Sequence, residues 1–492
     1  MKKESYLKLQ AQRLTDGQIN RRRFIMSAIA TGVTLPTAMS LATRAEAATP
    51  NKGGTFRMAL GHGSTTDSLD PSTAENDFST TVTYTRGNHL TEVSNTGELV
   101  GDLAESFEPS TDAKSWVINL RKGVEFHDGK SLTADDVIAS INYHRGEDSK
   151  SAAKGLVNQI SDIRKDGDNQ VIFDLESGNA DFAYILSDYH LMIMASADGS
   201  VDPTATNGTG GYVVENYDPG VRATFTRNPN YYKDGRAHFD AVEVYSILDV
   251  TARQNAVMNG DVDYSGDIDP KTVALLGRVP TLDIVEATGT QHYTFPMRLD
   301  TQPFDNYDLR MALKFAIKRQ ELVDKILLGH GEKGNDVPVN ASMPFFNTEL
   351  PVHEYDPERA AMHYKKSGHS GPIQLSAADA AFAGAVDAAQ LITASAKDAG
   401  IEIEVVREPS DGYWSNVWNK KGWCACYWSG RPTQDWMYSS AYTRDNEWND
   451  TAWRDTDAAL KFNDLIVAAR SETDQNLRRD QYWEAQSLLQ DD

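Results

Sequence analysis

The chain has 492 residues, of which 40% are hydrophobic and 24% are charged, and its formal net charge is −23. This length allows two to four domains with sizeable cores, and the composition is that of a globular protein. The first 47 residues hold eight Lys and Arg but three Asp and Glu, so the remainder carries a net charge of −28. Such an acidic chain repels nucleic acid and anionic lipid, which excludes nucleic acid as a partner.

The chain begins with a segment that is typical of an export signal. Arg21 and Arg22 precede Phe24, and a modestly apolar run then extends to residue 42. The paired arginines and the weak apolar run resemble a twin-arginine signal, and the small residues that follow predict cleavage between Ala47 and Ala48. An ordinary secretory signal or a retained anchor is the alternative. No later stretch is apolar enough to span a bilayer, so we expect residues 1–47 to be removed and a soluble periplasmic protein to remain.

After this segment the sequence alternates between strand and helix patterns. Residues 55–60 and 115–120 predict β-strands, the second because apolar and polar residues alternate along it. Thr133 predicts the start of a helix, since Asp136 completes an acidic capping box and Leu132 and Val137 form a hydrophobic staple around it. The chain is therefore expected to belong to the α/β class.

A series of motifs in the same order resembles a known family. Leu99-Val-Gly-Asp-Leu-Ala-Glu-Ser-Phe107 and the stretch from Leu120 to Val137 are similar to the signature of the dipeptide- and oligopeptide-binding proteins. These are the family 5 solute-binding proteins of ABC importers. The likeness covers nearly all of residues 50–492, and further motifs match at residues 208–212, 227–232, 249–253, 258–263, 303–319 and 355–360.

This resemblance implies a particular architecture. The fold is expected to be the bilobal periplasmic-binding-protein fold of the type II-like class, which closes around its ligand by a hinge. Lobe I is expected over residues 48–298, with an extra subdomain inserted at roughly 92–205, and lobe II over residues 299–492. Family members usually return to the first lobe near their C-terminus, and lobe II is here expected to lack this return.

Other clusters of residues are interpreted as structural. One helix is expected over residues 309–326, with an apolar face that packs into the core. Four aspartates between residues 261 and 269 lack EF-hand spacing, so we expect a solvated loop there rather than a calcium site. The histidines are scattered, and we predict neither a metal site nor a cofactor. Cys424 and Cys426 are interpreted as buried thiols, although a disulfide or a metal site is the alternative.

Seven of the nine tryptophans lie between residues 414 and 453, around a turn that carries Arg431 and Asp435. Aromatic walls with one charge of each sign would suit a small zwitterion, whereas the alternative is an aromatic core beneath a surface turn. In the dipeptide-binding branch of the resembled family, an acid after a Trp-Thr-Gly-like turn receives the amino group of the ligand. Trp428 begins the matching turn, which assigns that role to Asp435.

The candidate binding residues are therefore Trp428, Arg431, Asp435 and, less directly, Arg298 near the expected hinge. The alternative for Asp435 and Arg431 is an ion pair with each other at the surface, which would contribute under about 1 kcal/mol. The alternative for Arg298 is a salt bridge to Asp300 or Asp305.

Three functions fit these observations. The first is a binding protein that is not an enzyme, acts as a monomer and delivers a small peptide or a peptide-like polar solute to ABC permease subunits. The second is a secreted hydrolase, although no nucleophile motif or metal motif supports it. The third is a chaperone or a sensory binding protein on the same fold.

Overall fold

The computed structural model describes residues 6–7, 9–10, 13, 21–31, 33, 50–95, 97–472 and 474–492. The chain divides into two compact units, residues 1–55 with 235–241 and residues 56–234 with 242–492. In the first unit, Arg21, Arg22 and Phe24 fall in helix α2 (Arg21–Ala30). The predicted cleavage point at Ala47 and Ala48 lies outside the described residues. None of the helices in the described ranges is long and apolar enough to cross a bilayer.

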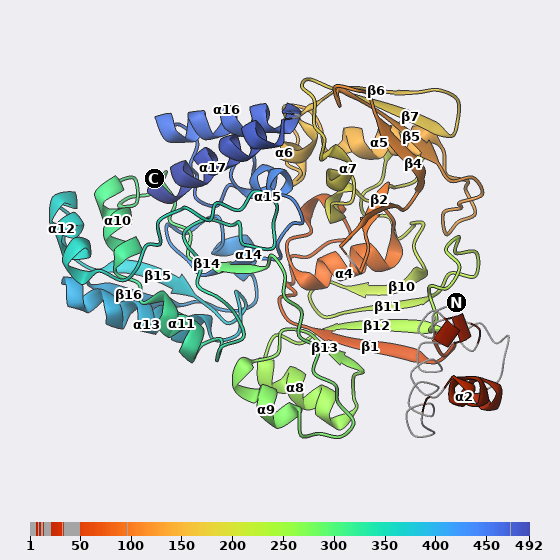
Figure 1. Ribbon diagram of the computed structural model, residues 1–492, viewed down its shortest axis with the longest axis horizontal. Coiled ribbons are helices and arrows are strands. Elements are labelled where there is room, and N and C mark those ends of the chain that lie inside the picture. The colour runs from red at the N-terminus through yellow and green to blue at the C-terminus, as the bar shows by residue number, and fades with distance from the viewer. Residues whose placement is uncertain are drawn as a thin grey trace. The chain divides into compact units, whose positions relative to one another are not determined.

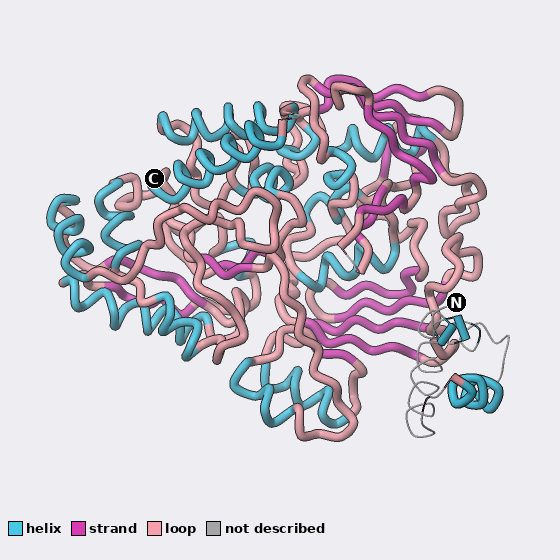
Figure 2. The backbone as a smooth tube through the Cα atoms, in the orientation of Figure 1, coloured by secondary structure: helices cyan, strands magenta, loops and turns pink. Residues whose placement is uncertain are grey.

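The second unit contains a five-stranded sheet (Figures 1 and 2). Its strand order is β10 (Tyr212–Asp218), β11 (Arg222–Arg227), β12 (Ala241–Ser246), β1 (Thr55–Leu60) and β13 (Tyr264–Ser265). The strand that the sequence predicts over residues 55–60 is confirmed as β1. Because β1 and β13 are parallel neighbours, the residues that follow these two strands emerge side by side.

A second sheet has four antiparallel strands, in the order β4 (Ala104–Pro109), β5 (Ser115–Leu120), β7 (Gln170–Leu175) and β6 (Ile160–Lys165). Helix α5 (Ala134–Tyr143) packs with this sheet, and the predicted capping box of Thr133 and Asp136 is present at its start. Leu132 and Val137, the predicted hydrophobic staple, are both buried. The short elements around the two sheets are α4 (Asp77–Arg86), β2 (Thr91–Val93), β3 (Leu99–Gly101), α6 (Lys154–Val157), α7 (Phe182–Ile185), η2 (Tyr189–Leu191), β8 (Ser196–Ala197), β9 (Ser200–Val201), α8 (Val250–Asn259) and α9 (Val273–Leu276).

The C-terminal part is mostly helical, with two strand pairs. The pairs are β14 (His292–Thr294) with β17 (Cys426–Trp428), and β15 (Ile373–Ala377) with β16 (Ile403–Arg407). The helices are α12 (Pro357–Ser367), α13 (Ala385–Ala396), α14 (Tyr413–Asn416), α15 (Gln434–Ala441), α16 (Asp457–Ser471) and α17 (Gln475–Asp491). Figure 1 shows α16 and α17 packed side by side.

The prediction of one helix over residues 309–326 is wrong in one respect. The segment forms two helices, α10 (Tyr307–Phe315) and α11 (Arg319–Lys325), with Lys318 outside helical geometry between them. Arg319 stabilises the break between the helices, because its guanidinium donates to the carbonyl of Lys314 at 3.0 Å and to both oxygens of Asp336 at 2.7 and 2.9 Å. The apolar face is buried as expected, and Leu309, Leu313 and Ala316 are among the least exposed residues of the chain.

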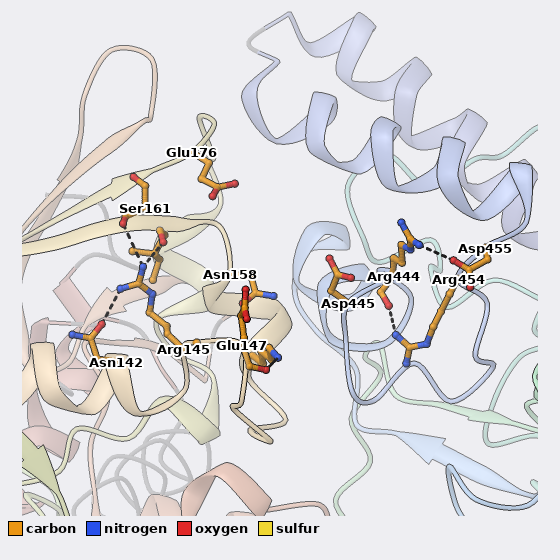
Figure 3. A pocket seen from close by; sticks show the side chains of 13 residues that line it. Asn142, Arg145, Glu147, Asn158, Ser161, Glu176, Arg444, Asp445, Arg454 and Asp455 are labelled. Carbon is orange, nitrogen blue, oxygen red and sulfur yellow. Dashed lines mark hydrogen bonds and ion pairs between the residues drawn. The ribbon is translucent and has the colours of Figure 1, made fainter.

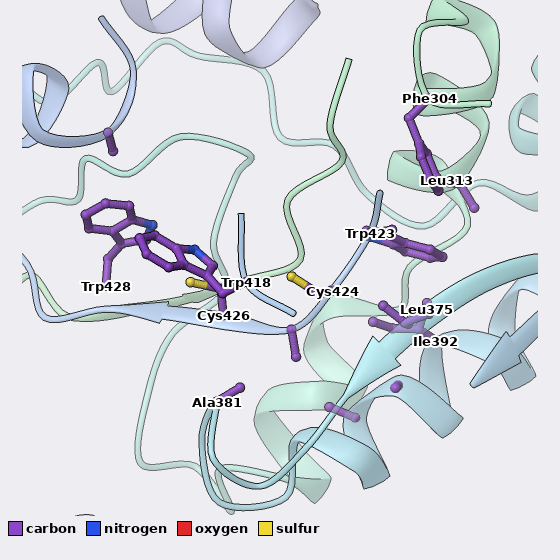
Figure 4. Packing of buried hydrophobic residues seen from close by; sticks show 14 of the residues in the cluster. Phe304, Leu313, Leu375, Ala381, Ile392, Trp418, Trp423, Cys424, Cys426 and Trp428 are labelled. Carbon is purple, nitrogen blue, oxygen red and sulfur yellow. The ribbon is translucent and has the colours of Figure 1, made fainter. Parts of the chain in front are cut away.

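The second unit is held together by three hydrophobic cores. The largest is built from residues between 304 and 489, and it contains Trp423, Cys424 and Cys426 (Figure 4). The second joins residues 90–193 with Trp436. The third is formed by side chains of the five-stranded sheet and of α4. Both cysteines are buried free thiols, as predicted, and burial raises the pKa of the Cys424 thiol to about 12.

Candidate functional site

A cavity of about 300 Å³ lies between helix α4 and η2 on one side and the segment that carries β17, α14 and α15 on the other. Its walls are largely aromatic, and eight Trp and Tyr side chains contribute: Tyr84, Tyr189, Trp414, Trp418, Tyr427, Trp428, Trp436 and Trp448. Its polar lining is provided by Glu75, Asn76, Asp77, Thr80, Ser429, Gly430 and Arg431. The cavity therefore combines apolar walls with a few charged groups, as small-molecule sites usually do.

The indole rings form an interlocked wall. The Trp418 ring meets those of Trp414, Trp428 and Trp448 edge to face, with centroid separations of 5.9, 6.0 and 5.3 Å. The Nε1 atoms of Trp418 and Trp428 both donate to Oδ2 of the buried Asp450, at 3.1 and 3.2 Å. Since these N–H groups are already bonded, the two indoles offer a ligand apolar ring surface rather than hydrogen bonds.

Trp423 and Trp453 of the same stretch belong to the core and do not line the cavity. Figure 4 shows Trp418 and Trp428 beside Cys426, whereas Trp423 lies apart from them, near Phe304. Trp423 donates to the carbonyl of Phe295 at 3.0 Å and is 2% exposed. The tryptophan-rich stretch thus supplies both cavity wall and core, and the binding of a zwitterion there stays a prediction. The alternative of a surface turn is wrong, because Arg431 and Asp435 are 4% and 0% exposed.

Arg431 supplies the positive charge of the cavity. It is 4% exposed, and its guanidinium stacks over the rings of Tyr189 and Trp436 at 5.3 and 5.5 Å. Burial alone would lower the pKa of Arg431, but Tyr189 and Asp188 outweigh it and the net shift is upward. Its guanidinium donates to the carbonyl of Gly430 at 3.0 Å and to the hydroxyls of Tyr189 and Ser429 at 3.4 and 3.5 Å, and its buried Nε has no hydrogen-bond partner among the described residues.

Asp188 stabilises this cation from behind the cavity wall. Its Oδ2 accepts a hydrogen bond from Nε1 of Trp436 at 2.8 Å and lies 3.8 Å from Nε of Arg431. Although burial opposes it, the charges of His190 and Arg431 hold the pKa of Asp188 well below its usual range. The charge of the buried arginine is therefore compensated by a buried carboxylate.

Glu75 and Asp77 supply negative charge on the opposite wall. Oδ1 of Asp77 accepts a hydrogen bond from the hydroxyl of Tyr427 at 3.0 Å. Oε1 of Glu75 accepts one from Ser415 at 3.4 Å. Burial, and then the neighbouring charge of Asp67, raises the pKa of Glu75 to about 7. The sequence reasoning missed both acids, and the only local signal was that Asn76 caps the start of α4.

Asp435 does not lie where the sequence reasoning places it. Its carboxylate is fully buried outside the cavity lining, at the first turn of α15. Oδ1 pairs with Nε of Arg470 at 2.5 Å, and Oδ2 accepts a hydrogen bond from Asn179 at 3.0 Å. Both oxygens are occupied by protein donors, so the expectation that Asp435 receives a ligand ammonium needs correction.

Arg298 also lies outside the cavity lining. Its Nε and NH2 groups donate to the two oxygens of Asp300, at 3.1 and 2.7 Å, and NH1 donates to Asn419. The salt bridge to Asp300 that was the alternative interpretation is the one observed. Of the four candidate residues, Trp428 and Arg431 line the cavity, and their role in binding stays a prediction.

A second hollow, more open and about 1070 Å³ in volume, has a different character (Figure 3). Figure 3 shows Arg145 and Asn142 on one side of it, facing Arg444 and Asp455 on the other. Arg145 donates to Asn142 at 2.8 Å, and Arg444 pairs with Asp455 at 2.8 Å. No aromatic side chain lines this hollow, so it lacks the apolar walls of the smaller cavity.

Sequence comparisons relate the chain to a family of known proteins. The model of the bacterial extracellular solute-binding proteins, family 5, middle region, matches residues 98–450. The Dipeptide-binding protein of Escherichia coli K12 is 26% identical over 443 residues, which cover 80% of each chain. Heme-binding protein A of Haemophilus influenzae is 26% identical over 294 residues, which cover 54% of this chain and 53% of that protein.

Solved structures share the fold. The periplasmic binding protein DppA of Helicobacter pylori, in complex with the peptide STSA, superposes with a TM-score of 0.81 at 20% identity, over 90% of this chain and 91% of that one. AgaA of A. tumefaciens R10, in complex with agropinic acid, gives 0.80 at 21% identity, over 88% and 89%. The predicted periplasmic-binding-protein fold is thereby confirmed, and the chain belongs to the bacterial extracellular solute-binding proteins of family 5.

Proposed function

We propose that the chain captures a small peptide or a peptide-like polar solute outside the cytoplasm and delivers it to the permease of an ABC importer. The observation that carries the proposal is the presence of Arg431, Glu75 and Asp77 in the lining of one aromatic-walled cavity. A zwitterionic solute has one charge of each sign. Its carboxylate would bind the guanidinium and its ammonium would bind the carboxylates.

The size of the cavity supports a small solute. A volume of about 300 Å³ is at the lower end of the range for small-molecule sites, which favours a solute of dipeptide size over a long peptide. Two of the similar proteins fit this class, since one is a dipeptide-binding protein and the other was solved with agropinic acid. We propose that the solute is bound and released unchanged, so a reaction product formed on incubation would contradict this part of the proposal.

The identity of the solute is best obtained by native purification followed by mass spectrometry of the released small molecule. Titration calorimetry of the stripped protein with that molecule then tests the site. Arg431→Gln should weaken binding by about ten- to a hundred-fold, because a charged hydrogen bond contributes ~1.5–3 kcal/mol.

A matched control is Arg479→Gln, since Arg479 pairs with Asp480 at the surface. This variant should bind with unchanged affinity. Equal affinity of the Arg431→Gln variant and the wild type would show that the solute does not contact this guanidinium.

We also propose that the precursor is exported by the twin-arginine route. Replacing Arg21 and Arg22 by Lys should leave precursor inside the cell, because this route reads the arginine pair. The matched control is Arg44→Lys, which changes an arginine outside the pair. Immunoblotting of cell fractions measures where the protein accumulates. Normal secretion of the double variant would reject the proposal.

A further inference from the structure

Three donor side chains meet beside the cavity, although they are far apart in the sequence. His62 follows strand β1 and Asp267 follows its parallel neighbour β13, so the pairing of the two strands brings these residues to one edge of the sheet. Asp77, the first residue of α4, approaches the same point. One ligand atom from each of the three lies within 4.8 Å of those of the others. Sequence reasoning had placed Asp267 in a solvated loop, and the strand pairing explains why it is instead drawn towards His62.

The separations between His62 and the two carboxylates are longer than the ~2.7–3.2 Å of ordinary hydrogen bonds. Nδ1 of His62 lies 3.5 Å from Oδ2 of Asp77 and 3.8 Å from Oδ2 of Asp267. The imidazole is 5% exposed, and neither its Nδ1 nor Oδ2 of Asp267 has a hydrogen-bond partner among the described residues. Leaving buried polar atoms unbonded is costly, which points to a ligand that these atoms share.

The distances suit a metal ion. Metal bonds from histidine nitrogen and carboxylate oxygen of ~2.1 Å, arranged tetrahedrally, place neighbouring donors roughly 3.4 Å apart. One imidazole and two carboxylates form a donor set of the kind that binds divalent first-row transition metals. We propose that His62, Asp77 and Asp267 bind one such ion, of which Zn²⁺ and Ni²⁺ are the probes.

The surroundings support the three donors. Oδ1 of Asp77 accepts the hydroxyl of Tyr427 at 3.0 Å, which orients the carboxylate and leaves Oδ2 for the ion. The ring of Tyr427 also lies against that of His62, with centroids 4.9 Å apart. Arg253 brings one positive charge nearby, bonded to the carbonyls of Gly266 and Asp267 at 3.2 Å, and the two carboxylates outnumber it.

Asp77 links this site to the cavity, because it also lines the cavity wall. The ion would therefore lie at the wall of the solute site rather than at a remote surface. The inference goes beyond solute capture and fails separately from it, because it is tested by metal content alone, without any solute.

The test uses the full mature chain, stripped with a chelator and then dialysed against ZnCl₂ or NiCl₂. Elemental analysis should find one equivalent of metal per chain. His62→Asn should lower the affinity by more than the roughly 10- to 100-fold that loss of an outer-shell partner costs. Asn is chosen because His62 has a left-handed backbone, with φ of 65°, which Asn tolerates.

The matched control is His330→Asn, which alters an exposed histidine that also faces a carboxylate, Glu286 at 3.1 Å. This variant should retain the metal. Asp267→Asn provides a second test if the His62 variant fails to fold, and circular dichroism identifies that case. Two outcomes would overturn the proposal: the wild type binds no metal, or His62→Asn and Asp267→Asn both bind metal as tightly as the wild type. The three side chains would then be an ion-pair cluster.

Discussion

Asp435 illustrates how a single buried carboxylate stabilises the protein. It is fully buried and pairs with Arg470, whose side chain is 9% exposed, and Asn179 and Ser439 complete its hydrogen bonds. Asp435→Asn removes the charge and leaves the guanidinium buried without compensation. We expect a loss of about 3–5 kcal/mol in the free energy of unfolding, because breaking a buried pair by removing one partner costs about that much.

Urea denaturation measures this loss, and Asp480→Asn is the control, since Asp480 is an exposed acid paired with Arg479. The control should change stability by under about 1 kcal/mol. Solute affinity of the folded Asp435→Asn variant should be unchanged. A large loss of affinity with unchanged stability would restore the role in ligand binding that the sequence suggested.

Glu75 should make solute binding depend on pH. Its pKa is raised to about 7, by burial first and then by Asp67, so its carboxyl is protonated below neutral pH and charged above it. An ammonium group of the solute binds the charged form more strongly. Affinity should therefore fall as pH falls, by roughly tenfold between about pH 8 and about pH 6, if the bound solute keeps the carboxylate ionised throughout.

Calorimetry at these two pH values measures the effect, with Glu75→Gln as the comparison. The variant has no titrating carboxyl at this position, so its pH dependence should be flatter. An equally steep dependence in the variant would assign the titration to another group.

At the scale of elements, the start of helix α5 shows what a sequence can specify. The capping box of Thr133 and Asp136 is a local pattern within four residues, and it was predictable for that reason. Asp136 also accepts the backbone N–H of Ser196 at 2.7 Å and pairs with Lys130. These bonds outweigh the effect of burial and lower the pKa of Asp136, so its stabilisation is present above about pH 4 and is lost as pH falls further.

Asp136→Asn should destabilise the protein by roughly 1.5–3 kcal/mol at neutral pH, which is the range for hydrogen bonds to a charged group. Asp135→Asn is the matched control, because Asp135 is the adjacent acid of the same helix turn and pairs with Lys165 in solvent. Thermal unfolding should show a small change for the control. Equal shifts in both variants would mean that the helix end, and not the buried network, determines the effect.

The candidate site could be predicted only in part, because one of its walls comes from a single stretch of sequence and the other comes from a distant segment. The wall formed by Trp428 and Arg431 belongs to one continuous stretch, so composition revealed it. Glu75 precedes α4 and Asp77 begins it, more than 300 positions earlier, and no spacing rule joins these acids to that stretch. The orientation of Asp435 depends on Arg470 of α16, a tertiary contact that the turn sequence does not contain.

The break between α10 and α11 has the same origin. No glycine or proline interrupts residues 309–326, and the apolar spacing is continuous, so a single helix was the reasonable prediction. The break depends on Arg319 reaching Asp336 and the carbonyl of His353, both from a later loop. Local signals therefore identify elements and caps, whereas contacts between distant segments decide where helices stop and which charges meet.

At the scale of the whole molecule, solvent-exposed hydrogen bonds join the segment before α4 to the segment around α14, on opposite sides of the cavity. The backbone N–H and the hydroxyl of Thr65 donate to Oδ1 of Asp411, each at 3.2 Å, and the hydroxyl of Thr66 bonds to Ser415 at 2.7 Å. Thr65 and Thr66 precede α4, whereas Asp411 and Ser415 belong to the segment around α14. Because these contacts join the two sides of the cavity, we expect them to favour the form of the protein that encloses a solute.

Asp411→Ala should therefore weaken solute binding although Asp411 is outside the cavity lining. Losing exposed hydrogen bonds of about 0.5–1.5 kcal/mol lowers the population of the enclosed form, and we expect affinity to fall about 2- to 10-fold. The loss should appear as faster release of solute in stopped-flow tryptophan fluorescence, because the contacts stabilise the bound form after encounter. Asp445→Ala, in the larger hollow, is the control and should leave both rates unchanged. Slower association with unchanged release in the Asp411 variant would show that this contact guides entry of the solute and does not hold the cavity closed.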